Sequence, residues 1–242
     1  MTWLVTGAAG GIGAATVELL TERGEAVLAQ DLDAERLGRL QGGGVERLAG
    51  DLTSRAFLDE LARRCVERGV RSAVAAHGIE GTGALHSLSA EQVRRVLAIN
   101  ASSIPALVDA LWPALTSTRG ALVAVVSQAG LVGEANNTAY SASKFAIMGW
   151  LRRARGPAAA SGISLRALCP GCTRTPLLMD AFARFARAEG RTVEEFERSR
   201  TAQISTGRLA EPAETAAAAL YLAEPDQPRP DVLAVTGGEV LW

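Results

Sequence analysis

Two residues that could transfer a proton stand close together in the run YSASK, where Tyr140 precedes Lys144 by four positions. On a helix, side chains four residues apart share a face with their Cβ atoms about 5–6 Å apart, so the phenol and the ammonium can reach the same small volume. A free tyrosine ionises near pH ~10, which is too high for a base at neutral pH. A neighbouring ammonium favours the phenolate and lowers that pKa. The pair therefore predicts a general acid or base at Tyr140, assisted by Lys144.

Ser127 adds a hydroxyl to this pair. It lies 13 residues before Tyr140 and directly follows the predicted strand 121–126. Open parallel sheets bind ligands beyond the carboxyl ends of their strands, which is where Ser127 would lie. A hydroxyl there can bind the oxygen of a substrate while Tyr140 exchanges its proton. We therefore expect Ser127, Gln128 and Tyr140 to contact the substrate.

A glycine-rich run, TGAAGGIG at residues 6–13, lies where the predicted strand 2–6 turns into a helix. Glycines let the backbone approach a pyrophosphate closely, and the start of a helix offers free N–H groups. The run departs from G-x-G-x-x-G because its third position is Thr16. It is no P-loop either, because no Gly-Lys-Ser/Thr follows. We expect the dinucleotide contacts of this turn at Gly7, Gly10, Gly11, Ile12 and Gly13.

Asp31 follows Gly13 by 18 residues, at the end of the second predicted strand. The carboxylate that binds the ribose hydroxyls of a dinucleotide is expected about 20 residues after the glycines. It would repel a 2′-phosphate, and the glycine run carries no basic residue to bind one, so the sequence predicts NAD rather than NADP. The alternative is that Asp31 only caps the next helix. Asp51 and Leu52, after the third strand, are expected near the adenine.

Apolar runs and helical patterns alternate along the whole chain. This alternation predicts an α/β class: a single-domain Rossmann fold with a doubly wound, seven-stranded parallel sheet and helices on both faces. Asn100 and Pro105 are expected to distort the long helix 89–115, and Pro157 to kink or end the helix 140–160 early. We expect one domain over 1–242. Its charged segment 177–206 is a lid over the site or, alternatively, a pair of surface helices. Predicted strands cover 2–6, 26–30, 45–48, 73–76, 121–126, 163–168 and 232–235, and shorter helices cover 12–23, 34–40 and 57–67.

The composition excludes several other classes. Hydrophobic residues make up 48% and charged residues 21%, which is typical of a globular protein, and the net charge of −1 lacks the basic surplus that nucleic-acid binding needs. The three cysteines are too few for a disulfide framework, which favours a reducing compartment. The first residues match neither a secretory signal nor a membrane span. We expect a cytoplasmic protein with a small-molecule substrate and no membrane or nucleic-acid partner.

Over its full length the chain resembles the compact short-chain dehydrogenases/reductases. This resemblance implies that Tyr140 is the general acid/base, that Lys144 lowers its pKa and holds the nicotinamide ribose, and that Ser127 orients the substrate oxygen. Asn100 would position a water in a proton relay toward Lys144. A homotetramer or dimer is also implied. The matching positions are TGAAGGIG at 6–13, Asp31, Asp51-Leu52, Asn100, Ser127, Tyr140, Lys144, Pro170-Gly171, Thr175-Pro176 and Gly237-Gly238. Further cofactor contacts are expected at Leu32, Ala75, Gly171, Cys172 and Thr175.

Two segments depart from the family pattern. After the fourth strand the chain reads Ala-Ala-His-Gly at 75–78, where the family usually has Asn-Asn-Ala-Gly. We expect His77 to replace the missing amides structurally, with contact to the cofactor as the alternative. Near the C-terminus, Thr236 stands where Asp is usual and the segment 227–230 is atypical. Because these segments help to build the tetramer in the family, the assembly is less well defined than the chemistry.

Three rival functions compete with an NAD-dependent oxidoreductase of secondary alcohols and ketones. Cys169 and Cys172 form a C-x-x-C that could be a thiol redox or zinc site, but its position matches the nicotinamide loop and the chain has only two histidines. A catalytically weak NAD-binding sensor or scaffold would not need all four reacting positions. Sugar-nucleotide epimerases usually have a longer C-terminal domain. The expected wall of the substrate pocket consists of Gln128, Leu131, Val132, Leu177, Leu178 and Phe182, which predicts a partly apolar substrate.

Overall fold

The computed structural model describes residues 1–81, 83, 88–134 and 137–240, and its centre is one seven-stranded sheet. The strand order is β3-β2-β1-β4-β5-β6-β7, and every adjacent pair is parallel. This order reverses direction between β1 and β4, as in a doubly wound sheet. The strands are β1 (Thr2–Thr6), β2 (Ala26–Asp31), β3 (Val45–Ala49), β4 (Val70–Ala75), β5 (Ala121–Val125), β6 (Ser164–Pro170) and β7 (Val232–Val235).

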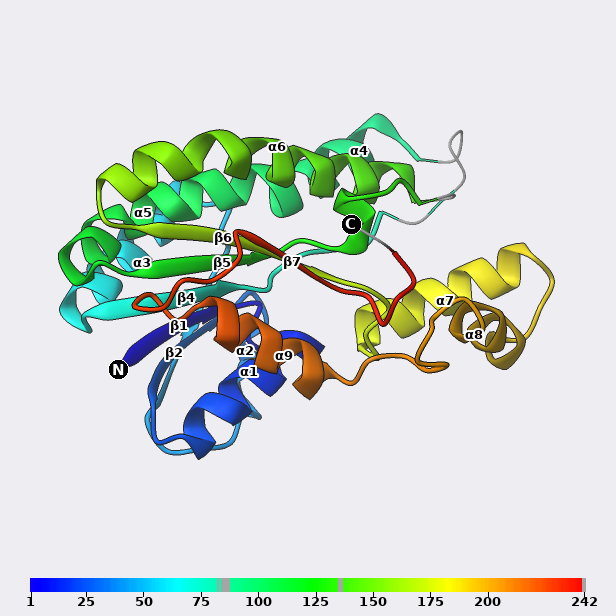
Figure 1. Cartoon of the computed structure of the whole chain (residues 1–242), viewed down its shortest axis with the longest axis horizontal. Coiled ribbons are helices and arrows are strands. Elements are labelled where there is room, and N and C mark those ends of the chain that lie inside the picture. The colour runs from blue at the N-terminus through cyan, green and yellow to red at the C-terminus, as the bar shows by residue number, and fades with distance from the viewer. Residues whose placement is uncertain (82, 84–87, 135–136, 241–242) are drawn as a thin grey trace.

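Helices cover both faces of the sheet (Figure 1). On one face, α3 (Arg55–Glu67), α5 (Ser103–Thr118) and α6 (Thr138–Ala160) pack Leu61, Leu107 and Ile147 into one core. On the other, α1 (Gly11–Glu22) and α9 (Pro212–Leu222) pack Leu20 and Leu220 into a second core. The short α2 (Ala34–Gly38) packs Leu37 into the same core. Burial on both faces explains why the central strands read as unbroken apolar runs.

The expected long helix is divided into three parts. α4 (Ala90–Val96) begins with a capping box at Ser89 and Gln92, passes into a π-helical segment (Leu97–Ser102), and continues as α5. The predicted distortion thus falls at Asn100, inside the π-helical segment. By length and composition the stretch Ala90–Thr118 could cross a membrane, but here its apolar side chains pack against α3 and β4 as part of the core.

Two elements differ from the sequence-based expectation. Pro157 does not end α6, which continues to Ala160, because the helix needs to give up only one backbone hydrogen bond there while Ala158 stays buried. The helix α9 had no prediction; its alanine-rich sequence gives a weak pattern, although Pro212 and the capping pair Glu211 and Glu214 mark its start.

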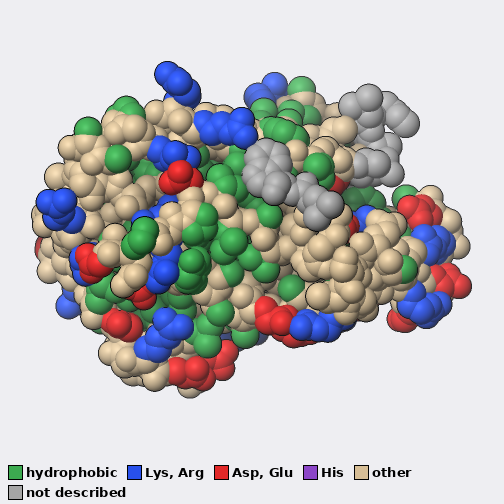
Figure 2. Space-filling model, in the orientation of Figure 1, with side chains coloured by type: hydrophobic (Ala, Val, Ile, Leu, Met, Phe, Trp, Pro, Cys, Tyr) green, Lys and Arg blue, Asp and Glu red, His purple; other side chains and the backbone are tan. Residues whose placement is uncertain are grey.

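Helices α7 (Pro176–Ala188) and α8 (Val193–Thr201) project beyond the carboxyl end of the sheet (Figure 1). They share a small apolar cluster in which Phe196 packs against Phe182 and Phe185, with ring centres 5.1 and 5.7 Å away. The cluster includes Cys172, which follows β6, so it connects the helix pair to the edge of the sheet. On the face shown in Figure 2, basic and acidic side chains are interspersed over this pair.

Candidate active site

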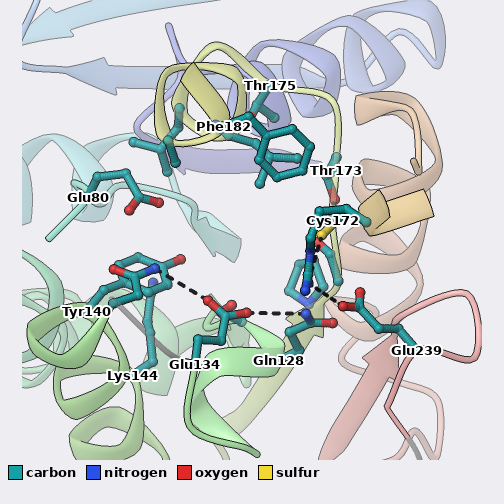
Figure 3. Close-up of a pocket in the computed structure, with 18 of the residues that line it drawn as sticks. Glu80, Gln128, Glu134, Tyr140, Lys144, Cys172, Thr173, Thr175, Phe182 and Glu239 are labelled. Atoms are coloured by element: carbon teal, nitrogen blue, oxygen red, sulfur yellow. Dashed lines mark hydrogen bonds and ion pairs between the residues drawn. The ribbon is translucent and has the colours of Figure 1, made fainter. Parts of the chain in front are cut away.

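A cleft of about 680 Å³ opens between the carboxyl ends of the central strands and the α7–α8 pair (Figure 3). Its walls come from segments far apart in the sequence: the ends of β4, β5 and β6, the start of α6, and both projecting helices. It brings together twelve of the residues expected in the site or its wall, whereas Leu131, also expected there, packs in the core. The twelve are Ile12, Ser127, Gln128, Val132, Tyr140, Lys144, Gly171, Cys172, Thr175, Leu177, Leu178 and Phe182.

Tyr140 and Lys144 lie on the first turns of α6 and face the cleft, as their spacing predicts. The Nζ atom of Lys144 lies 5.4 Å from the centre of the Tyr140 ring and donates a hydrogen bond of 3.1 Å to the carbonyl of Val125 at the end of β5. The lysine is only 3% exposed. It is also the only lysine in the sequence. Its ammonium is therefore fixed beside the phenol by the backbone of the sheet.

The pKa values of this pair differ from the simple expectation of an ammonium activating a phenol. Loss of bulk water raises the pKa of Tyr140, the carboxylates of Glu80 and Glu134 raise it further, and a hydrogen bond with Ser127 opposes them. Burial lowers the pKa of Lys144 to about 8, against the attraction of Glu80. In this state the protein alone does not lower the pKa of Tyr140. Tyr140 is a protonated phenol at neutral pH.

Asn100 lies behind the cleft rather than in its wall and is 1% exposed. Its side chain accepts a hydrogen bond of 2.8 Å from the backbone N–H of Ile79 and donates to the carbonyl of Ile79 and to Oγ of Ser143. Asn100 thus ties the segment after β4 to the helix that carries Tyr140. A Cβ atom on Gly78 would meet both Asn100 Oδ1, at 3.4 Å, and Lys144 Nζ, at 3.7 Å, so the two side chains converge on one point.

The glycine turn after β1 leaves no room for larger residues. A Cβ on Gly13 would lie 2.1 Å from the carbonyl oxygen of Gly7, and one on Gly7, whose φ is +64°, would lie 2.6 Å from the backbone of His77. The N-cap of α1, Gly10, offers no side chain to its first N–H groups. These groups are the donors that a phosphate needs. The turn therefore fits the pyrophosphate of a dinucleotide.

Thr175 closes the other side of this turn. A Cβ on Gly11 would lie 2.6 Å from Cγ2 of Thr175, so the threonine packs directly over the glycine. Its Oγ1 accepts a hydrogen bond of 3.2 Å from the N–H of Leu178 and caps α7. The same residue therefore sets the start of the projecting helix and one wall of the cleft.

Asp31 ends β2 at the same edge of the sheet. Its two carboxylate oxygens accept hydrogen bonds from the N–H groups of Ala9, at 2.9 Å, and Asp33, at 3.1 Å. The cap of α2 is Asp33, which accepts from the N–H of Arg36, so Asp31 is not the capping residue. The carboxylate is instead anchored beside the glycine turn.

The remaining expected cofactor residues lie outside the cleft wall. Leu32 is exposed, and Asp51 accepts hydrogen bonds from the backbone and hydroxyl of Thr53 in an exposed turn. Leu52 and Ala75 are buried in the core, and it is Ala76, the residue after β4, that lines the cleft. Gly7, Gly10, Gly11 and Gly13 form the neighbouring turn rather than the wall.

His77 joins two elements at the mouth of the site. Its Nδ1 lies 2.7 Å from Oγ1 of Thr6 and its Nε2 lies 2.8 Å from Oγ of Ser103. Because Ser103 donates its own proton to the carbonyl of Ile99, it must accept from Nε2–H, which defines the neutral tautomer. Burial and the nearby Lys144 lower the pKa of His77 to about 3. His77 is thus a neutral link between β1, the end of β4 and α5.

The two cysteines of the C-x-x-C are both free and buried. Burial raises the pKa of Cys169 and of Cys172 to about 11. A reactive thiol needs a lowered pKa. Among the described residues no group of His, Cys, Asp and Glu could hold a metal ion. These thiols therefore lack the features of a redox pair.

Several polar residues of the cleft were not anticipated. Glu134 lies between Ser127 and Tyr140 in the sequence. This position was the one signal that could have placed it in the cleft. Arg200 in α8 pairs with Glu239 near the C-terminus, a contact between distant segments that no local pattern reveals. The unanticipated lining residues include Glu80, Glu134, Asn137, Arg200 and Glu239.

Comparison with known proteins agrees with this geometry. The family model for short chain dehydrogenase matches residues 1–185. The cis-4-hydroxycyclohexanecarboxylate dehydrogenase of Sinomonas cyclohexanicum is 35% identical, over 91% of this chain and 88% of its own. The D-beta-hydroxybutyrate dehydrogenase of Cupriavidus necator is 28% identical, over 91% of this chain and 90% of its own.

Among solved structures, a variant of actinorhodin polyketide ketoreductase with NADPH superposes with a TM-score of 0.91 and 27% identity, covering 98% of this chain and 96% of its own. The sheet order, the glycine turn and the cleft of Ser127, Tyr140 and Lys144 thus occur in a chain whose relatives oxidise hydroxyl groups or reduce keto groups. The chain belongs to the short-chain dehydrogenase family and is a hydride-transfer oxidoreductase.

Proposed function

We propose that this protein is an NAD-dependent oxidoreductase that interconverts a secondary alcohol and its ketone, with Tyr140 as the general acid/base. The observation that carries the proposal is the convergence of Tyr140, Lys144 and Ser127 on one cleft beside the glycine turn. The bound nicotinamide supplies or accepts the hydride in this chemistry. The protein's own groups must bind the substrate oxygen and move its proton.

Ser127 and Tyr140 would hold the substrate oxygen from two sides. The Ser127 hydroxyl lies within hydrogen-bonding reach of the phenol and accepts from the N–H of Ala129, which fixes its position. For ketone reduction Tyr140 donates its proton to the developing alkoxide, and its raised pKa keeps that proton in place beforehand. For alcohol oxidation Tyr140 must lose the proton first. The positive charge of Lys144 and of the oxidised nicotinamide then favours the phenolate.

Lys144 would carry the proton between Tyr140 and solvent, and Asn100 would position the relay. Both side chains approach the same point beside Gly78. With a pKa near 8, Lys144 can give up and regain a proton near neutral pH. Asn100 holds the backbone of Ile79 in place. These contacts support a positioning role for Asn100 in a relay that runs through Lys144.

Asp31 supports NAD as the cofactor. Its anchored carboxylate lies where the ribose of the adenine half would bind, and a 2′-phosphate there would face a negative charge. The nearest basic side chain of α2, Arg36, donates to the carbonyl of Ala9. Thr175, Gly171 and Cys172 would hold the nicotinamide end from the opposite side of the cleft.

We also propose that residues 177–206 form the substrate lid of a single domain over 1–242. Leu178 and Phe182 face the cleft while Phe196 holds the two helices together. A homo-oligomer, a cytoplasmic location and the absence of nucleic-acid or membrane partners remain predictions. Sedimentation of the purified protein would test the first of these.

The test is a screen of secondary alcohols and ketones with NAD(H) and NADP(H), following the absorbance of the reduced cofactor. Tyr140→Phe should lower kcat by at least about a hundredfold while NADH still binds. Tyr221→Phe is the matched control, because it alters the only other tyrosine, which is 44% exposed on α9. Wild-type turnover by Tyr140→Phe would refute the acid/base role. Binding of NADH without turnover of any alcohol or ketone would instead favour a cofactor-binding sensor or scaffold.

A further inference from the structure

Glu134 presents a fixed carboxylate to the cleft, close to Tyr140. One of its oxygens accepts a hydrogen bond of 3.2 Å from Nε2 of Gln128, and the other accepts one of 3.3 Å from Nδ2 of Asn137. Its backbone N–H donates to Oγ of Ser141 on α6. The carboxylate is therefore held by two side chains (Figure 3 shows the contact with Gln128), and the backbone of Glu134 is held by Ser141.

These contacts also determine how the two amides are turned. A carboxylate only accepts hydrogen bonds, so Gln128 and Asn137 must each direct an NH2 group at Glu134. Their carbonyl oxygens, Gln128 Oε1 and Asn137 Oδ1, are left buried without a partner, and each residue is only 4% exposed. Glu239 Oε2 is a third such oxygen in the same wall. These oxygens are buried beneath the wall, Gln128 Oε1 against Gly171, so the acceptor that this part of the wall offers to a ligand is the Glu134 carboxylate.

The charged residues around the cleft also favour a ligand with a positive charge. Two of its cations are already paired, Arg200 with Glu239 and Arg191 with Glu189. The carboxylates of Glu80 and Glu134 both raise the pKa of Tyr140, and Figure 3 shows them facing the same open space as its ring. Lys144 is the third cation of the described wall, and its ammonium is bound to the sheet backbone. Arg200 also interacts with Glu134 and Lys144 with Glu80, so the four carboxylates and three cations of the described wall leave a net charge of −1.

Resting on the oxidoreductase function proposed above, we propose that the substrate carries a protonated amine and that Glu134 binds this ammonium group. The substrate class is therefore an amino alcohol or the corresponding amino ketone. An ammonium offers three donors, no acceptor and a positive charge, which matches the carboxylate that Glu134 presents to the cleft. Hydrogen bonds between charged partners are also about twice as strong as neutral ones.

The opposite wall suits the hydrocarbon part of such a molecule. Leu178, Phe182 and Phe185 line the cleft from α7. A substrate would then lie with its ammonium on Glu134, its reacting oxygen between Ser127 and Tyr140, and its carbon skeleton against the lid. A neutral polyol could supply the donors but not the charge, so charge is the property to test.

Binding of small probes tests this without requiring turnover. Cyclohexylammonium, cyclohexanol and cyclohexanecarboxylate have the same ring and differ in charge. We expect the complex of the protein with NADH to bind cyclohexylammonium at least about tenfold more tightly than the other two, by titration calorimetry. Equal affinities, or a preference for the alcohol or the carboxylate, would overturn the proposal with the wild-type protein alone.

Variants then assign the preference to Glu134. Glu134→Gln keeps the size of the side chain and should reduce the ammonium preference to about twofold or less. Glu194→Gln, an exposed change on α8, should keep the full preference. A preference that survives Glu134→Gln would assign ammonium binding elsewhere and refute the role of this residue.

Turnover separates the failure of this proposal from failure of the oxidoreductase function. The panel is 4-aminocyclohexanol, 4-methylcyclohexanol and 4-hydroxycyclohexanecarboxylate, the last being the kind of compound named for the relative from Sinomonas cyclohexanicum. We expect the highest kcat/KM with the amine. Turnover that favours the methyl or carboxylate compound refutes amine recognition and leaves the reaction class standing. Failure of the oxidoreductase proposal would appear as equal turnover by the wild type and Tyr140→Phe. Ammonium recognition is measured separately, by the calorimetry.

Discussion

The Nδ1 atom of His77 lies 2.7 Å from Oγ1 of Thr6, so side chains join the ends of β4 and β1 at the edge where the cleft opens. In related sequences amide side chains are expected at this edge, whereas here one imidazole bonds to both Thr6 and Ser103. The ring is neutral in this link because burial and the nearby Lys144 lower its pKa.

His77 should make the protein sensitive to acid. The pKa of His77 is near 3 in the folded protein and 6.5 in the unfolded chain. Between these two pH values the unfolded chain therefore binds more protons than the folded protein. The stability present above pH ~6.5 is therefore lost progressively as the pH falls toward ~3. His77→Asn should flatten the dependence of Tm on pH in this window, measured by calorimetry. An identical slope in the variant would show that other groups dominate.

Lys144 should cost stability at neutral pH. The pKa of Lys144 is about 8 in the folded protein and 10.5 in the unfolded chain. Burial of its charge therefore lowers the free energy of unfolding by the full amount below pH ~8, and this loss disappears as the pH rises to ~10.5. Lys144→Met should abolish activity yet raise the free energy of unfolding at pH 7 by up to about 3 kcal/mol. Because the chain has one lysine, ¹⁵N-lysine NMR follows its titration directly. A midpoint above pH ~10 would contradict the burial of the ammonium.

Asp31 should control the choice of cofactor. Asp31→Ala removes the negative charge expected near the ribose, so KM for NAD should rise at least about tenfold while KM for NADP changes little or falls. Asp33→Ala, which removes the actual cap of α2, should lower stability by about 1 kcal/mol without changing the ratio of the two KM values. An unchanged ratio in Asp31→Ala would refute the ribose contact.

Two glycine substitutions should have opposite effects. Gly13→Ala places a Cβ 2.1 Å from the carbonyl of Gly7, so it should distort the turn, lower Tm and weaken NADH binding. Gly149→Ala lies in the middle of α6 with nothing within 4 Å, so it should raise stability by about 0.5–1 kcal/mol. NADH fluorescence titration and thermal unfolding give both results. Normal NADH affinity in Gly13→Ala would contradict the tight turn.

Phe196→Ala should loosen the lid without unfolding the sheet. Phe196 packs against Phe182 and Phe185 in a cluster separate from the two main cores. We expect faster hydrogen exchange in α7 and α8 and a KM for substrate raised several-fold, with NADH affinity unchanged. Glu194→Ala, exposed on the same helix, is the control. A uniform rise in exchange across the sheet would show that the lid belongs to the global folding unit.

Local patterns were sufficient for most of the architecture. Short apolar runs predicted all seven strands to within a few residues, and the central ones are nearly continuous because strands buried on both faces need no alternation. The edge strand β3 is half-buried and carries Glu46 and Arg47. Helical spacing placed Tyr140 and Lys144 on one face, and a strand end placed Ser127 beside them. The helix α9 was missed because its alanine-rich turns carry little contrast between faces, and the effect of Pro157 was overestimated because one lost hydrogen bond does not end a helix.

The sequence by itself predicted the sheet, the glycine turn and the residues proposed for the chemistry, because each prediction depends on neighbours a few positions away. Only the tertiary structure decided their electrostatics. The pKa of Tyr140 is raised rather than lowered because burial and two carboxylates outweigh the hydrogen bond from Ser127. Asn137, Arg200 and Glu239 all line the cleft although they come from three separate segments of the chain. Burial and charge depend on what lies near in space, and spacing along the chain does not encode that.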